Sequence, residues 1–108
     1  MIYSISELKQ IIAPIACKYS IPAVYLFGSY ARGEANDHSD VDILIDREGS
    51  AIRGLFDLGA LYNDLNETLG KPIDLVTTDS VAQPEVQRRT PLFAKKLERE
   101  RLVIYERH

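Results

Sequence analysis

Hydrophobic and polar positions alternate with a helical period near the N-terminus of the chain. Apolar residues recur there every three or four positions, which predicts an amphipathic helix. Ser4 and Glu7 have the spacing of a capping box at the start of this helix. Pro14 lies within the pattern, and we expect it to kink or restart the helix. The apolar positions expected on the inner face are Leu8, Ile11, Ile12, Ile15 and Ala16.

Short apolar runs predict strands farther along the chain. Residues 23–27 and 41–45 each form a run with the length and composition of a buried strand. Residues 72–76 form a third run, which begins at Pro72, a position where a strand loses no ladder donor. Residues 102–105 are a candidate closing strand.

Two further helices are predicted between these strands. Residues 52–69 repeat apolar side chains at helical spacing, and Gly70 is a suitable C-terminal stop. Thr90 and Pro91 are typical of the N-cap and first residue of a late helix that runs to about residue 99. The expected inner face of the helix over 52–69 comprises Leu55, Leu58, Tyr62, Leu65 and Leu69.

Strands interleaved with helices predict an α/β (α+β) fold, in which helices back a small mixed sheet. The 108 residues fit one domain, 1–108, without an internal repeat or linker. No apolar run approaches the roughly 20 residues that a membrane helix needs, and the N-terminus lacks the pattern of a signal peptide. Cys17 is the single cysteine, and its apolar surroundings predict a buried thiol. We expect a cytoplasmic protein without membrane contact.

Charge is distributed unevenly along the chain. Residues 1–84 hold 6 Lys/Arg and 12 Asp/Glu, whereas residues 85–108 hold 7 and 4, within a net charge of −3. A mildly acidic chain argues against broad affinity for a nucleic-acid backbone, so we expect no direct nucleic-acid binding. The basic C-terminal segment is interpreted as a solvated helix face, with contact to an acidic partner as the alternative.

The first candidate site feature is a Gly-Ser pair directly after the strand at 23–27. Gly28 permits a sharp turn and a close approach of the backbone to a ligand. Ser29 offers a hydroxyl and an N–H at an expected helix start, where peptide dipoles favour a phosphate. Arg32 can either contact a phosphate or hold the loop in place by pairing with an acidic side chain. A plain turn is the alternative for the Gly-Ser pair.

The second feature is a pair of acids at the start of the strand over 41–45. Because side chains alternate along a strand, Asp40 and Asp42 are expected on one face while Val41 points to the core. Two carboxylates about 6.6 Å apart repel by roughly 2–3 kcal/mol at an effective dielectric near 20. A cation between them reverses that sign, and hard oxygen ligands suit Mg²⁺ or Mn²⁺. A solvated pair at a strand edge is the alternative.

The third feature is Asp74, an acid inside an otherwise apolar strand. A charge there is costly unless it is paired, solvated or bound to a metal, and an exposed edge position is the alternative. If its strand lies beside the strand of Asp42, Asp74 completes a three-carboxylate site that can hold two metal ions. A phosphate cradle with metal-binding carboxylates meets the needs of nucleotidyl transfer, with Asp74 as the candidate acceptor of the hydroxyl proton.

These motifs resemble a known family signature. Residues 28–33 read Gly-Ser-Tyr-Ala-Arg-Gly, and residues 39–42 read Ser-Asp-Val-Asp. This pattern resembles the GS-x-x-RG loop followed by SD-x-D of the minimal nucleotidyltransferases of the DNA-polymerase-β superfamily. Asp74 corresponds by context to the third acid of that family, and the resemblance covers about residues 5–80.

The resemblance implies a fold, a cofactor, a donor and a partner. It implies a nucleotidyltransferase domain with Asp40, Asp42 and Asp74 as catalytic and metal-binding residues for two Mg²⁺ ions, and ATP as donor. Gly28, Ser29 and Arg32 are the implied nucleotide-binding residues. Members of the family are often paired with a HEPN-domain ribonuclease toxin, and some neutralise it as antitoxins by transferring AMP to a tyrosine. The resemblance therefore implies such a toxin as acceptor, with which the chain can assemble.

Two other functions remain open from the sequence. The chain can be an antitoxin that neutralises its partner by stoichiometric binding and uses the fold as a scaffold. Three acids expected on one face speak against that interpretation, because a scaffold does not need them. Transfer of a nucleotide to a small molecule is the other alternative, for which we expect the 108 residues to leave little room for a dedicated acceptor-binding domain.

Overall fold

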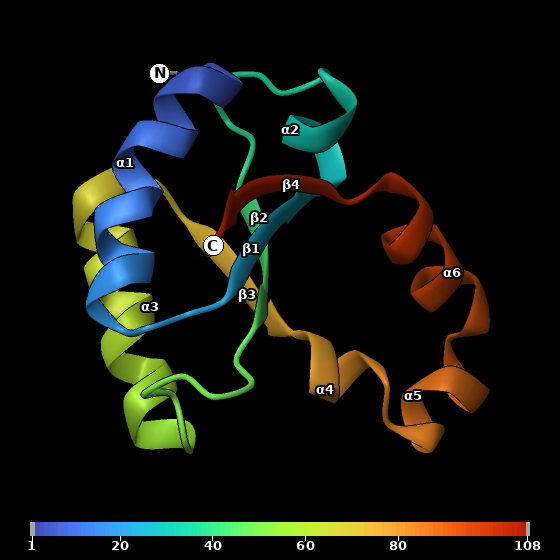
Figure 1. The fold of residues 1–108 in the computed structure, drawn as a ribbon. Helices are drawn as coiled ribbons and strands as arrows, with labels where there is room; N and C mark the ends of the chain where they lie inside the picture. The colour runs from blue at the N-terminus through green and yellow to red at the C-terminus, as the bar shows by residue number, and fades with distance from the viewer. Residues whose placement is uncertain (1, 108) are drawn as a thin grey trace.

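A four-stranded mixed sheet forms the centre of the computed structural model, which describes residues 2–107. The strand order is β3-β2-β1-β4 (Figure 1). β2 pairs in parallel with β3, whereas β1 is antiparallel to both β2 and β4. The predicted mixed sheet backed by helices is therefore confirmed. The strands are β1 (Ala23–Phe27), β2 (Val41–Asp46), β3 (Ile73–Thr77) and β4 (Leu102–Glu106).

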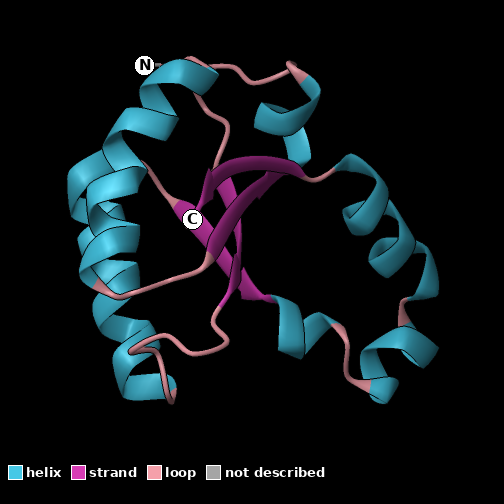
Figure 2. Ribbon diagram, in the orientation of Figure 1, coloured by secondary structure: helices cyan, strands magenta, loops and turns pink. Residues whose placement is uncertain are grey.

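Two long helices, α1 (Ile5–Lys18) and α3 (Leu55–Leu69), lie together on one side of the sheet (Figures 1 and 2). The larger hydrophobic cluster lies between these helices and the strands. Alternate residues of β2 enter it, as the sequence predicted, and all three are essentially fully buried. They are Val41, Ile43 and Ile45.

Residues 78–100 form a limb of three helices on the other side of the sheet (Figure 1). A smaller cluster of Phe27, Leu44 and Leu97 packs α6 against this face. The short helices that lead to α6 bury no residue fully, so no apolar period in the sequence predicted them. The limb consists of α4 (Thr78–Val81), α5 (Pro84–Arg89) and α6 (Pro91–Glu100).

The N-terminal helix α1 begins as predicted but differs at its proline. Ser4 and Glu7 form both hydrogen bonds of a capping box. The helix continues through Pro14 as one element from Ile5 to Lys18, so the predicted restart is wrong. The inner face extends on both sides of the proline, and its burial outweighs the one backbone hydrogen bond that Pro14 cannot donate.

The inner face of α3 agrees with the predicted one at Leu65 and Leu69, and in part at Leu58, but not at its other positions. Leu61, Leu65 and Leu69 are buried, whereas Leu55 is 87% exposed and Tyr62 is also exposed. Both candidate faces have helical spacing, and only packing against α1 and the sheet selects between them. Gly70 ends the helix in the left-handed conformation, as predicted.

Three smaller expectations have different outcomes. Cys17 is exposed, which corrects the predicted buried thiol, because it lies on the outer face of α1 with its Sγ 3.5 Å from the Tyr105 hydroxyl. Thr90 is the N-cap of α6 as predicted, but its hydroxyl donates to the carbonyl of Val86 instead of capping the helix. Among residues 2–107, no helix has the length and apolar character needed to cross a membrane.

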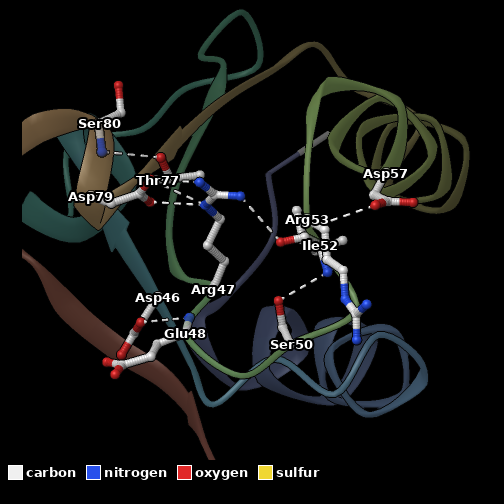
Figure 3. Close-up of polar contacts among 10 residues, drawn as sticks. All are labelled: Asp46, Arg47, Glu48, Ser50, Ile52, Arg53, Asp57, Thr77, Asp79 and Ser80. Carbon is white, nitrogen blue, oxygen red and sulfur yellow. Dashed lines mark hydrogen bonds and ion pairs between the residues drawn. The ribbon is translucent and has the colours of Figure 1, made fainter.

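A polar cluster lies at the C-terminal ends of β2 and β3, where α4 begins (Figure 3). Arg47 donates hydrogen bonds of 2.9–3.1 Å to both carboxylate oxygens of Asp79 and one of 3.2 Å to the carbonyl of Ile52. The Thr77 hydroxyl accepts from the N–H of Ser80 and caps α4. This cluster sets the direction in which the chain leaves the sheet toward α6.

Candidate active site

Two acids lie side by side at the N-terminal ends of β2 and β3. Asp42 and Asp74 are direct register partners in the parallel pair, so the predicted adjacency of their strands is confirmed. Asp42 alternates with Val41 and Ile43, and therefore faces the side of the sheet that α6 covers. Asp42 is half-buried, whereas Asp74 is exposed. Two carboxylates on neighbouring strands thus share one surface.

Gly28 packs directly against the carboxylate of Asp42. It follows Phe27, which is paired with Asp42 across β1 and β2, and it has a φ of 68°. A Cβ at this position would overlap Oδ2 of Asp42 and lie 3.0 Å from its Cγ. Only glycine combines this conformation with this closeness. The turn into α2 (Gly28–Arg32) therefore depends on Gly28, as the sequence indicated.

A cavity of about 260 Å³ opens over these residues. It brings together four of the six predicted site residues, from α2, β2 and β3, and adds Phe27 of β1 and a wall from α6. Asp40, just before β2, and Ser29, in α2, are not in its lining. The lining residues are Phe27, Gly28, Arg32, Asp42, Asp74, Phe93, Lys96, Leu97 and Glu100.

The electrostatics of the site centre on Asp42. Burial, the negative charge of Asp74 and the negative charge of Asp40 raise the pKa of Asp42 to about 6. The positive charge of Arg32 acts in the opposite direction. Asp40 and Asp74 therefore both lie within electrostatic reach of Asp42, and positive charge near Asp42 would relieve their repulsion.

The donor chemistry of the site fits a divalent cation at two of the three acids. Asp42 and Asp74 present hard oxygen ligands from paired positions, and their repulsion is relieved by a cation between them. Within residues 2–107, no three acidic, histidine or cysteine side chains are gathered closely enough to hold a metal ion as they stand. Asp40, which is exposed ahead of β2, is the acid that stands apart from the cavity.

Arg32 makes the acid contacts that were one of its two predicted roles. Its Nε donates to Glu34 at 3.1 Å, and its Nη1 donates to Glu100 of α6 at 3.4 Å. It also lines the cavity, so the second predicted role, contact with a phosphate, remains a prediction.

The sequence interpretation missed the contribution of α6. Phe93, Lys96, Leu97 and Glu100 line the cavity, which corrects the view of this basic segment as a solvated face only. Their positions differ by three, four and seven, so they occupy one face of a helix. That spacing was visible in the sequence, but the position of the acids relative to this face depends on how α6 packs on the sheet.

A buried tyrosine and lysine connect the Gly28 turn to the strand of Asp74. Tyr30, only 3% exposed, accepts a hydrogen bond of 2.8 Å at its hydroxyl from Nζ of Lys71. Lys71 lies two residues before β3, and its ammonium also lies 5.3 Å from the centre of the Tyr30 ring. Tyr30 therefore packs the turn after Gly28 against the core and ties it to the segment before β3.

Known proteins are similar to this chain in sequence. Residues 9–108 match the family described as polymerase beta, nucleotidyltransferase. MJ0435 of Methanocaldococcus jannaschii, named as a candidate protein adenylyltransferase, is 42% identical over 72% of this chain and 82% of its own length. The protein adenylyltransferase MntA of Thermococcus cleftensis is 41% identical over 59% of this chain and 63% of its own length.

A solved structure gives the same architecture. A toxin–antitoxin protein crystallised with AMP-PNP superposes with a TM-score of 0.68, covering 93% of this chain and 74% of that one, at 19% identity. This likeness shows a shared fold. With the match over residues 9–108 and the relatives above, it identifies the chain as a member of the polymerase beta nucleotidyltransferase family.

Proposed function

We propose that the chain transfers AMP from ATP to a tyrosine hydroxyl of a HEPN-type ribonuclease toxin and thereby acts as its antitoxin in the cytoplasm. The observation that carries this proposal is the pairing of Asp42 with Asp74 above a cavity that also contains Gly28 and Arg32. Paired carboxylates beside a close backbone approach and a guanidinium suit a metal-bound nucleoside triphosphate.

The relatives support a protein as the acceptor. MntA of Thermococcus cleftensis is named a protein adenylyltransferase, and MJ0435 is named as a candidate for the same activity. The toxin–antitoxin neighbour was crystallised with a nucleotide analogue. The HEPN identity of the toxin and the tyrosine acceptor come from the family signature at residues 28–42.

The proposed reaction is an in-line displacement at the α-phosphate of ATP. The tyrosine oxygen forms a bond to that phosphorus, the bond to the β-phosphate oxygen breaks, and pyrophosphate leaves. The exposed carboxylate of Asp74 accepts the proton of the attacking hydroxyl. Arg32 contacts the phosphates, and the Gly28 backbone lets the nucleotide approach Asp42.

The three acids are the proposed ligands for Mg²⁺. Asp42 and Asp74 present their oxygens at paired positions, and Asp40 contributes from the segment before β2. When bound, Mg²⁺ supplies Lewis-acid stabilisation of charge on the phosphates and lowers the pKa of the acceptor hydroxyl.

The test uses the purified chain with a purified HEPN-type toxin, Mg²⁺ and ATP labelled at either the α- or the γ-phosphate. We expect label on the toxin from α-labelled ATP only, and none with EDTA or with Asp42→Asn. Asp46→Asn is the matched control, because it removes an acid at the other end of β2 and is expected to leave the labelling unchanged. Label from γ-labelled ATP would instead indicate a kinase-like reaction.

The same samples separate catalysis from simple occlusion. The ribonuclease activity of the toxin is measured after incubation with the wild-type chain or with Asp42→Asn. Neutralisation by the wild type alone supports AMP transfer. Neutralisation by both, without label on the toxin, supports a stoichiometric antitoxin and contradicts the proposed reaction.

A further inference from the structure

One face of α6 forms the second wall of the active-site cavity. Phe93, Lys96, Leu97 and Glu100 share this face and line the same cavity as Asp42. Leu97 is 4% exposed and packs on Phe27 and Leu44 of the sheet, which anchors the helix above the acids. The side chains one turn before and after it, Phe93 and Glu100, are thereby held at the edge of the site.

The two walls carry opposite charge. The sheet contributes Asp42 and Asp74, whereas Lys96 of α6 and Arg32 of α2 contribute positive charge to the same cavity. Lys96 is exposed and forms no ion pair within residues 2–107. A triphosphate placed in this cavity can contact cations bound by the two acids and, at the same time, the basic side chains of the cavity.

Glu100 places a negative charge on this otherwise basic wall. Its carboxylate accepts from Nη1 of Arg32 at 3.4 Å, while Glu34 accepts from Nε of the same guanidinium at 3.1 Å. The contact with Glu100 is the longer of the two and joins α2 to α6. A phosphate oxygen that binds the terminal nitrogens of Arg32 must compete with this carboxylate.

We propose that α6 is the polyphosphate-binding wall of the site: Lys96 binds the phosphates of the donor nucleotide, and Glu100 weakens that binding by competing for Arg32. This inference rests on the proposed function for its donor and adds the residues that hold it. Lys96 and Glu100 lie one helical turn apart and act on the same ligand in opposite directions.

The test measures the affinity of the purified chain for α,β-methylene-ATP in the presence of Mg²⁺, by isothermal titration calorimetry. This analogue retains the triphosphate charge but cannot release AMP, so binding is separated from transfer. Lys96→Ala is expected to raise Kd about fivefold, because a charge-assisted contact at an exposed site is lost. Lys95→Ala, which removes the same charge from outside the cavity lining, is the matched control and is expected to leave Kd within about twofold.

The second pair of variants tests the opposing residue. Glu100→Gln is expected to lower Kd about threefold, since Arg32 is released for the phosphates. Glu98→Gln removes the same charge two residues away, on another face of α6 and outside the lining of this cavity, and serves as its control. Inorganic tripolyphosphate is titrated in parallel, and the same two effects on its Kd assign both residues to the phosphates rather than to the adenosine.

The outcomes distinguish this inference from the proposed function. An unchanged Kd for Lys96→Ala, in a chain that still labels the toxin with AMP, overturns the role of α6 and leaves the function standing. Equal effects of Lys95→Ala and Lys96→Ala overturn it as well, because the effect is then one of net charge. A wild-type chain that binds neither probe and transfers no AMP contradicts the inference and the function together.

Discussion

The two faces of the sheet differ in packing and in charge. The face under α1 and α3 holds the larger hydrophobic cluster, which includes Leu8, Ile43 and Leu65. The face under α6 holds a cluster of only three buried residues, with cavities of about 200 and 260 Å³ beside it. Alternation along β2 separates the two faces, because Val41 enters the first while Asp42 enters the second. One face therefore supplies most of the buried core, and the other carries the candidate site with less apolar packing.

Truncation of a core leucine on each face is expected to give the largest effect on stability. Leu8→Ala removes a side chain that is fully buried in the larger cluster, and we expect it to lower the free energy of unfolding by about 3–4 kcal/mol. Leu97→Ala is expected to lower it by about 1–2 kcal/mol, since the cavities on both sides already deprive Leu97 of neighbours. Urea unfolding of both variants measures the difference. Equal losses would show that the two faces contribute alike.

Gly28→Ala tests whether the candidate site depends on the close contact between Gly28 and the Asp42 carboxylate. An alanine here combines a left-handed backbone with overlap on the Asp42 carboxylate, so we expect AMP transfer to fall by about a hundredfold. Gly49→Ala is the matched control, because Gly49 has a φ of 71° but no atom within 4 Å of the point that a Cβ would occupy. It is expected to lose stability from backbone strain and to keep its activity. A similar loss of activity in both variants would assign the effect to strain alone.

Asp42→Asn is expected to stabilise the protein while it removes the proposed activity. The folded pKa of Asp42, about 6, lies above the usual 3.8, so the folded chain binds more protons between these values and loses stability as the pH rises through them. A shift of about two units corresponds to roughly 3 kcal/mol, which solvent screening at this half-buried carboxyl reduces to about 1–2 kcal/mol. Asparagine avoids this cost.

The measurement compares urea unfolding of Asp42→Asn and the wild type at pH 7.5 and at pH 4, with EDTA present. The stability gain is expected at pH 7.5 and should be almost absent at pH 4, where Asp42 is largely protonated in the folded chain. Glu67→Gln, at an exposed position of α3, is the control. An equal gain at both pH values would exclude the ionisation of Asp42 as its cause.

Local patterns predicted the elements that bury an apolar face. The core strands and the helices α1 and α3 follow from the pattern of their apolar residues, α6 follows from the Thr90-Pro91 start signal, and alternation placed Val41 and Asp42 on opposite sides of β2. The helices α4 and α5 bury no residue fully, so the sequence carried no period from which to predict them. The inner face of α3 was predicted in part: Leu65 and Leu69 are buried as predicted, but Leu61 takes the place expected for Leu55 and Tyr62.

The candidate site also contains residues that the sequence predicted and residues that only the fold revealed. Gly28, Asp42 and Asp74 were found from the sequence, since each breaks a local rule for its strand or turn. Lys96 and Glu100 break no such rule and look like ordinary surface charges of a helix. Their place in the cavity follows from the packing of Leu97 on Leu44, which brings together residues far apart in the chain. Such a contact depends on the tertiary fold rather than on local pattern.

Tyr30→Phe changes a residue that connects the larger hydrophobic cluster with the candidate site. The Tyr30 ring is buried in the larger cluster, yet it directly follows Ser29 and its hydroxyl accepts from Lys71, just before the strand of Asp74. Loss of the hydroxyl removes one acceptor from a buried ammonium, so we expect the free energy of unfolding to fall by about 1 kcal/mol. Tyr62→Phe, at an exposed position of α3, is the control and should change little. If AMP transfer falls further than the fraction of folded chain explains, the packed face also positions the Gly28 turn against Asp74; if transfer follows stability alone, the two faces act independently.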